Sequence, residues 1–162
     1  MKWDFILPLP IFLLVLLIQI TMVPLIAIAG VVPDLILILL VYYSITKGQL
    51  YGTILGASFG ISVDLITGGL LGSAMLSKTV VGFIAGYFSS ETKREINITT
   101  YYFSLIVFIS ALVDSVIFSF FSTFDLRSNI FSLFFEQALL PALYTGVVSI
   151  LFIFSPFKRK SF

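Results

Sequence analysis

The sequence predicts an all-α membrane protein, a polytopic bundle of six transmembrane helices in one domain spanning 1–162. Hydrophobic residues occupy 59% of the 162 positions and charged residues only 10%, whereas soluble domains have roughly half apolar and a quarter charged residues. Polar, glycine and proline positions also divide the chain into six apolar blocks, and a helix needs about 20 such residues to cross the hydrocarbon layer.

The six predicted spans follow one another with short connections, at about 5–28, 31–46, 50–66, 69–88, 98–122 and 130–154. The first block ends near Ala27-Ile28-Ala29, as a signal peptide could. It is longer than the roughly 7 to 15 apolar residues of a cleavable signal, so we interpret it as an uncleaved anchor. The second and third blocks are short, which leaves a five-span arrangement with one re-entrant segment as an alternative.

Lysine and arginine positions predict the orientation, because short cytoplasmic loops collect these residues. With the N-terminus inside, the outer loops hold only Arg127. The cytoplasmic segments then hold Lys2, Lys47, Lys93, Arg94, Lys158, Arg159 and Lys160. Both termini are therefore expected in the cytoplasm, and the even parity favours six spans over five.

Cysteine and histidine are both absent from the sequence. Their absence removes disulfides, thiolate nucleophiles, most zinc sites and the commonest general base. The formal net charge of +1 gives no reason to expect a nucleic-acid partner. No cofactor, metal or catalytic residue is predicted, and the remaining enzyme hypothesis is an intramembrane aspartyl pair such as Asp64 and Asp114.

Glycines recur at four-residue spacing in the third and fourth predicted spans: Gly52, Gly56 and Gly60, then Gly82 and Gly86. This spacing keeps each set on one helix face, where backbones can approach closely and gain van der Waals contact. Two interpretations remain open. The face packs between these two neighbouring spans, or it receives a transmembrane helix of another protein.

Five ionisable residues fall within or at the edges of the predicted spans. Such charges cost at least about 2.5 kcal/mol each near the bilayer centre, so they are expected to face the bundle interior. On the predicted topology they form an outer-half polar cluster of Asp34, Asp64, Lys78, Asp114 and Glu136.

Asp114 and Glu136 lie at equal sequence distances from Asp125, so an antiparallel hairpin would place them at similar depth. Two such carboxylates do not both ionise cheaply: one is protonated, Lys78 neutralises the pair, or a cation binds. The direction of the Cβ bonds also predicts that Lys78 reaches Asp64. A structural polar cluster, a substrate or ion site, and a docking surface all remain open.

The local sequence predicts a structural role for two further residues, Asp34 and Pro141. Asp34 follows Pro33 at the start of a span, where a carboxylate can cap exposed N–H groups and face the positive end of the helix dipole. Pro141 lies inside the last predicted span and removes a backbone hydrogen bond, so we expect a kink there.

Several motifs together resemble the rod shape-determining protein family MreD. They are Pro33-Asp34-Leu35-Ile36-Leu37-Ile38-Leu39-Leu40, Lys47-Gly48, Gly52-x3-Gly56-x3-Gly60-x3-Asp64-Leu65-x2-Gly68-Gly69-x2-Gly72, Gly82-x3-Gly86 and Gln137-Ala138-Leu139-Leu140-Pro141. Each piece is apolar with small residues and weak alone, but their order, spacing and the chain length make the joint match fairly specific.

The resemblance implies a non-enzymatic scaffold of the bacterial cell-elongation complex, which makes peptidoglycan. It implies binding to MreC and, with it, to the RodA glycosyltransferase and its transpeptidase partner, while the oligomeric state is not indicated. It also implies a fold similar to the substrate-capture subunits of energy-coupling-factor transporters.

That last likeness supplies a rival function, capture of a vitamin in an outward-facing pocket. Such capture subunits usually carry Ala-x3-Ala patterns low in the first helix, for docking their coupling protein. The residues from Phe12 to Gln19 are instead bulky and aliphatic. The absence of this Ala-x3-Ala pattern favours the scaffold function over vitamin capture.

Overall fold

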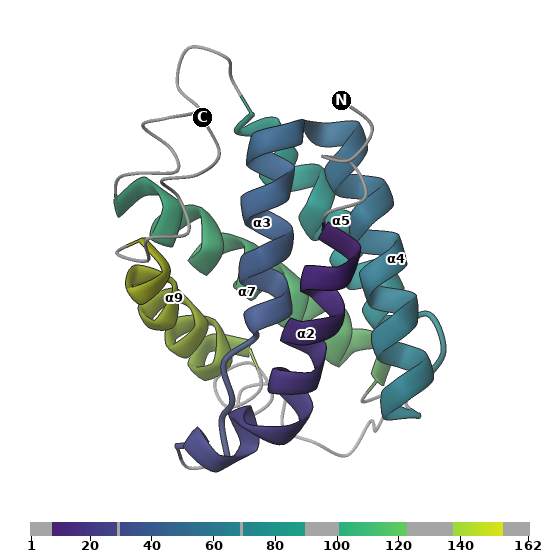
Figure 1. Cartoon of the computed structure of the whole chain (residues 1–162), viewed down its shortest axis with the longest axis vertical. Helices are drawn as coiled ribbons and strands as arrows, with labels where there is room; N and C mark the ends of the chain where they lie inside the picture. The colour runs from purple at the N-terminus through teal and green to yellow at the C-terminus, as the bar shows by residue number, and fades with distance from the viewer. Residues whose placement is uncertain (1–7, 29, 69, 90–100, 123–137, 154–162) are drawn as a thin grey trace.

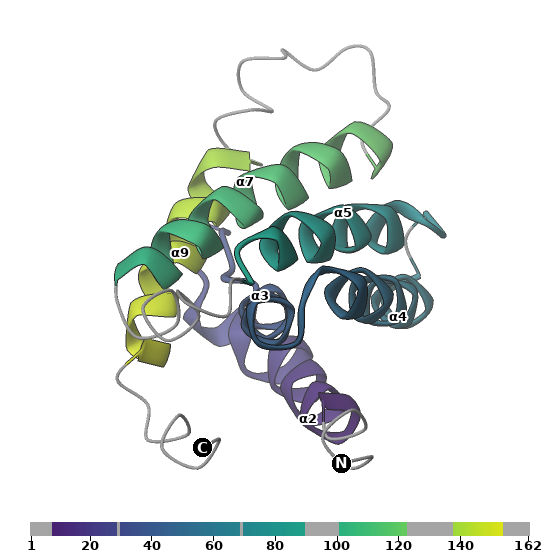
Figure 2. The ribbon, with the colours of Figure 1, turned by 90° about the horizontal axis from the view of Figure 1, so that it is seen from above.

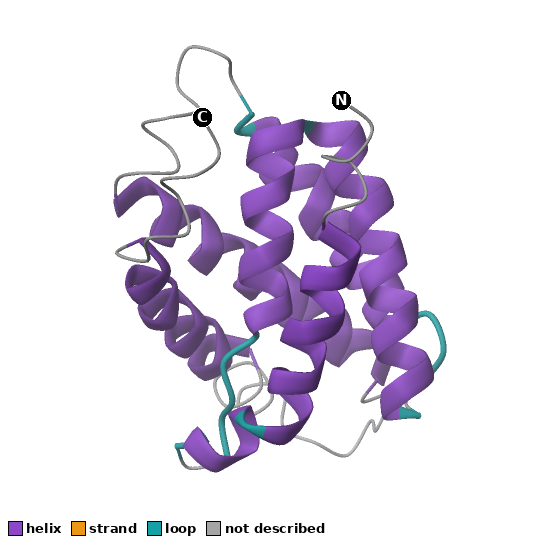
Figure 3. Ribbon diagram, in the orientation of Figure 1, coloured by secondary structure: helices purple, strands orange, loops and turns teal. Residues whose placement is uncertain are grey.

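The computed structural model describes residues 8–28, 30–68, 70–89, 101–122 and 138–153. Within these ranges the regular structure is helical, with one isolated bridge between Ile28 and Val31, which confirms the predicted all-α class (Figure 3). The elements are α2 (Pro8–Thr21), the 3-10 helix η1 (Val23–Ile26), α3 (Leu35–Lys47), α4 (Gln49–Thr67), α5 (Ser73–Tyr87), α7 (Tyr101–Ser122) and α9 (Leu140–Ile153).

Two helices in the described ranges are long and apolar enough to cross a membrane by length and composition, Gln49–Thr67 and Tyr101–Phe121. Three more are apolar but shorter: Pro8–Thr21, Leu35–Lys47 and Leu140–Leu151. The predicted number of six spans therefore stays a prediction.

Helix α3 lies at the centre of the bundle and packs against α2, α4, α5, α7 and α9 (Figures 1 and 2). Its sequence explains this position, because Ile36 to Val41 is apolar on every face and each of these side chains is buried. The most extensive contact joins α4 to α5, which form an antiparallel hairpin, and α7 packs against both α5 and α9.

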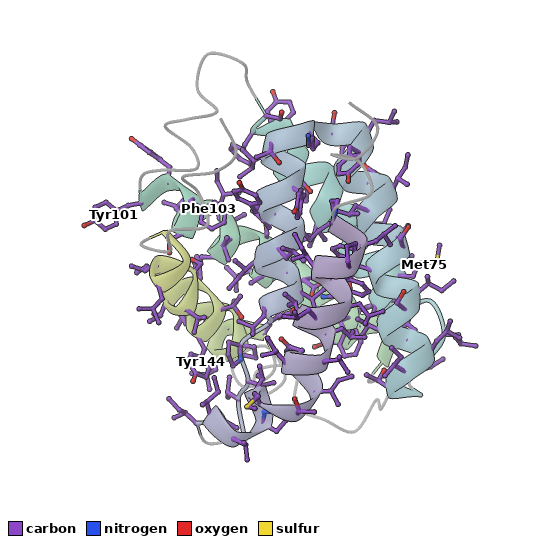
Figure 4. All side chains as sticks on the ribbon, viewed as in Figure 1. Met75, Tyr101, Phe103 and Tyr144 are labelled. Carbon is purple, nitrogen blue, oxygen red and sulfur yellow. The ribbon has the colours of Figure 1, made fainter. Side chains whose placement is uncertain are left out.

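The core lies where α3 meets its neighbours, and it includes the fully buried Leu40, Phe59 and Phe103. Phe12 of α2 stacks on Phe59 of α4, with ring centroids 3.9 Å apart. Much of the outer surface is also apolar, and Figure 4 shows Tyr101 projecting away from the bundle. A surface of this kind suits a lipid environment.

The helix boundaries differ from the predicted spans where local chemistry ends a helix. The α-helical part of the first span ends at Thr21 and continues as a 3-10 turn around Pro24, because proline has no N–H to extend the ladder. Helix α3 begins after Asp34 rather than at 31, because the Asp34 carboxylate accepts a hydrogen bond from the backbone N–H of Leu37.

Candidate functional site: a buried ion cluster beside a glycine-packed hairpin

Lys78 is the centre of a three-residue group that we call the ion cluster, comprising Asp34, Lys78 and Asp114. The Lys78 ammonium Nζ lies 2.7 Å from Asp34 Oδ2 and 3.3 Å from Asp114 Oδ2. The side chains of Lys78, Asp34 and Asp114 are 5%, 29% and 12% exposed. One lysine therefore joins three helices, because Asp34 begins α3, Lys78 lies on α5 and Asp114 lies on α7.

Asp34 is held from several directions. Its Oδ1 accepts the N–H of Leu37 at 2.9 Å, which caps α3, while its own backbone N–H donates to Thr145 Oγ1 at 3.0 Å. Thr145 is buried on α9, so this contact ties the last helix to the start of α3. The sequence predicted the cap at Asp34 but not its ion pair with Lys78.

One edge of the ion cluster has unpaired polar atoms. Asp114 Oδ1 and Ser110 Oγ are both buried and have no hydrogen-bond partner. The two residues are four positions apart on α7, so they lie on the same helix face. Sequence reasoning did not single out Ser110, although a serine one turn before a buried aspartate was a usable signal.

Asp64 lies apart from the ion cluster, and the predicted approach of Lys78 to Asp64 is wrong. Asp64 Oδ2 accepts the backbone N–H groups of Gly72 at 2.9 Å and Met75 at 3.1 Å, and Oδ1 accepts that of Ala74 at 3.1 Å. The carboxylate thus caps the N-terminus of α5 from the neighbouring helix, where the helix dipole favours negative charge. These local donors satisfy Asp64, and Lys78 pairs with other carboxylates.

The turn between α4 and α5 makes this cap possible. Gly68 ends α4 in the left-handed conformation with φ of 66°, and Gly72 precedes α5 with φ of 102°. Only glycine adopts such values routinely, so the two glycines let the chain reverse within a few residues and bring α5 back to Asp64.

The predicted glycine stripe faces α5 inside the hairpin. A Cβ added to Gly56 would overlap the backbone carbonyl of Lys78, and one added to Gly60 would overlap the backbone at Ala74 and Met75. Gly52 and Gly82 approach each other in the same way, and a Cβ at Gly86 would meet the backbone of Gln49. The backbones are therefore in contact along both stripes, as small residues permit.

Two predicted features fall wholly or partly on residues outside the described ranges. Glu136, Asp125 and Arg127 are among these residues, so the pairing of Asp114 with Glu136 stays a prediction. Pro141 stands in the first turn of α9, directly after a π-helical turn at 138–139. Since the preceding part of that predicted span lies outside the described ranges, the kink also stays a prediction.

Gln19 is a second polar residue whose role sequence reasoning missed. Its Nε2 donates to the carbonyl of Pro33 at 2.9 Å, and its Oε1 accepts the N–H of Leu35 at 2.9 Å. This amide therefore fixes the start of α3 against α2. A lone glutamine in an otherwise apolar helix was the available signal, because an amide removed from water needs partners.

Comparison with protein families decides the identity. The family model described as rod shape-determining protein MreD matches residues 1–158. The chain belongs to the MreD family. As a member of this membrane family, the protein has a role in determining rod shape. Comparisons with curated proteins and with solved structures give no match, so the likeness to transporter capture subunits has no further support.

Proposed function

We propose that this MreD-family protein is a non-enzymatic, multi-pass membrane scaffold of the bacterial cell-elongation complex. Its proposed partners are MreC and, with it, the RodA glycosyltransferase and its transpeptidase partner. The observation that carries the proposal is the MreD match over residues 1–158 of the 162-residue chain.

The way polar groups are used in the bundle supports a scaffold over an enzyme. The sequence contains no cysteine or histidine. Asp64 accepts three backbone N–H groups of the α4–α5 turn and α5, whereas Asp114 contacts Lys78, so these two carboxylates share no partner. An aspartyl pair would instead need both carboxyl groups at one reacting centre. The described carboxylates join helices to one another, as expected of a rigid platform.

The glycine contacts bear on where a partner helix would bind. Because Gly52, Gly56 and Gly60 meet the backbone of α5 or side chains of α3, a helix of another protein would bind on a different face. We therefore propose that partners contact the outer apolar surfaces of the bundle, and that the α4–α5 hairpin acts as its rigid interior.

Copurification combined with depletion tests the scaffold. Gentle solubilisation of membranes should recover MreC with this protein, and depletion should round or swell a rod-shaped host. The matched control is depletion followed by expression of the wild-type chain, which should restore rods. Normal shape on depletion, with loss of uptake of one vitamin, would reject the scaffold in favour of a transporter subunit.

We also propose six spans with both termini in the cytoplasm, supported by the distribution of lysine and arginine. The absence of native cysteine permits single-cysteine labelling. An impermeant thiol reagent should label Leu126→Cys in intact cells and spare Lys93→Cys, which should react only after the membrane is permeabilised. The reverse pattern would overturn the topology.

A further inference from the structure

The ion cluster contains an imbalance of charge when all three groups are ionised. Lys78 contributes one positive charge, and Asp34 and Asp114 contribute two negative charges. Both contacts with Lys78 lie inside the bundle, where the lysine side chain is 5% exposed. A net negative charge in such surroundings is costly, and a buried ionisable group commonly becomes neutral instead.

Geometry distinguishes the two carboxylates. The 2.7 Å contact of Lys78 with Asp34 has the length of a charge-assisted hydrogen bond, whereas the 3.3 Å contact with Asp114 is longer. Asp34 also accepts the N–H of Leu37 at the positive end of α3 and is the more exposed of the two. Asp34 is therefore the more closely paired of the two carboxylates.

Asp114 has the opposite environment. Its Oδ1 is buried without a hydrogen-bond donor, and the buried Ser110 Oγ, one helical turn earlier, also lacks a partner. A buried carboxylate oxygen that accepts no hydrogen bond is costly to keep ionised.

We propose that Asp114 is a proton-binding site, in which Oδ1 carries the proton. The proton is transferred from a hydronium ion of the solvent, whose O–H bond breaks as the new O–H bond forms on Oδ1, and a water molecule is left. Lys78 and Asp34 then form a neutral ion pair, and Asp114 Oδ2 remains an acceptor for Lys78. Loss of the proton restores the net negative charge between α5 and α7.

The charged groups that face Asp114 are few in the part of the chain that the structure describes. Lys78 faces it from α5 and Asp34 from the start of α3. Helix α9 contributes the uncharged Thr145, which binds the backbone of Asp34. Proton occupancy at Asp114 should therefore govern how tightly α7 packs against α5.

Isosteric substitutions separate the two carboxylates, because asparagine imitates a neutral carboxylic acid and not a carboxylate. In detergent at neutral pH, Asp114→Asn should melt within about a degree of the wild type. Asparagine keeps the volume and neutral charge of a protonated aspartate, so the small net stability of the bundle changes little. Asp34→Asn should melt clearly lower, because Lys78 loses its charged partner. A large fall for Asp114→Asn, with little change for Asp34→Asn, would overturn the assignment.

Infrared spectroscopy of the wild-type protein provides a test that needs no variant to fold. The carbonyl stretch of a protonated carboxylic acid should be present at neutral pH, shift when aspartate is labelled with ¹³C, and disappear at high pH. Glu136→Gln is the control and should keep the band, while Asp114→Asn should remove it. Absence of a ¹³C-sensitive acid band at neutral pH would overturn the proposal.

A final experiment distinguishes a bound proton from a bound metal cation. Exchanging sodium chloride for choline chloride at constant ionic strength should leave the melting temperature of the wild type unchanged. If sodium raised the melting temperature of the wild type but not that of Asp114→Asn, a metal cation would bind in place of the proton. That result would overturn the proposal.

Discussion

Two buried carboxylates of the bundle, Asp64 and Asp114, are accommodated in opposite ways. Asp64 accepts backbone N–H groups only 8 to 11 residues away, within its own hairpin. Asp114 contacts Lys78 36 residues away and retains an unpartnered oxygen. A turn can satisfy a buried charge locally, whereas a charge between distant helices depends on the whole bundle and can respond to its surroundings.

Removing Lys78 should have the largest effect and would test the ion cluster most directly. Lys78→Met keeps most of the side-chain volume but leaves Asp34 without its charged partner. We expect a loss of about 3 kcal/mol in unfolding free energy, the lower end for a broken buried pair, because Asp34 is partly exposed. Thermal unfolding in detergent measures the change.

Leu76→Met is the matched control for Lys78→Met, since Leu76 lies on the exposed side of the same helix. It should leave the melting temperature nearly unchanged. Equal stability of Lys78→Met and wild type would show that the ion cluster contributes nothing to the packing of α3, α5 and α7.

A large side chain in the glycine stripe should have the next largest effect, because it acts on the α4–α5 hairpin that Asp64 caps. The Cβ of Gly56→Leu would overlap the Lys78 carbonyl, so the helices must separate. Overpacking typically costs about 1 to 3 kcal/mol. The isolated protein should therefore melt lower, whereas Ser58→Leu, on the exposed side of α4, should not. Unchanged melting of Gly56→Leu with loss of a copurifying partner would instead assign the stripe to a partner.

Replacing the carboxylate at the hairpin turn should have an intermediate effect. Asp64→Asn keeps one acceptor oxygen but directs an NH₂ group at backbone donors, so at least one of the three N–H contacts is lost. We expect a loss of about 1.5 kcal/mol and faster hydrogen exchange at the start of α5. Exchange that quickens equally throughout α7 would contradict the local character of this cap.

Sequence reasoning predicted the all-α class from composition and the cap at Asp34 from residues close together in the chain, and it reached the MreD family from the resemblance of motifs spread between Pro33 and Pro141. It placed Lys78 near Asp64 from the hairpin that holds both, and it also offered Lys78 as the group that neutralises Asp114. Lys78 contacts Asp114 and also Asp34, which is 44 residues away and becomes adjacent only when α3 packs against α5. The roles of Gln19 and Thr145 were missed for the same reason, since each binds backbone of another segment.

The smallest expected effect concerns Thr145, whose hydroxyl ties α9 to the ion cluster through the backbone of Asp34. Thr145→Val preserves the shape of this buried side chain but removes the acceptor for the Asp34 N–H, 3.0 Å away. An unmade hydrogen bond of this kind costs about 1 kcal/mol. Thr67→Val is the control, because Thr67 is exposed and its hydroxyl bonds only within its own helix. Melting temperatures in detergent should fall for Thr145→Val and not for Thr67→Val. If both variants matched the wild type, the link from α9 to Asp34 would be dispensable, and the ion cluster would join α3, α5 and α7 without help from the last helix.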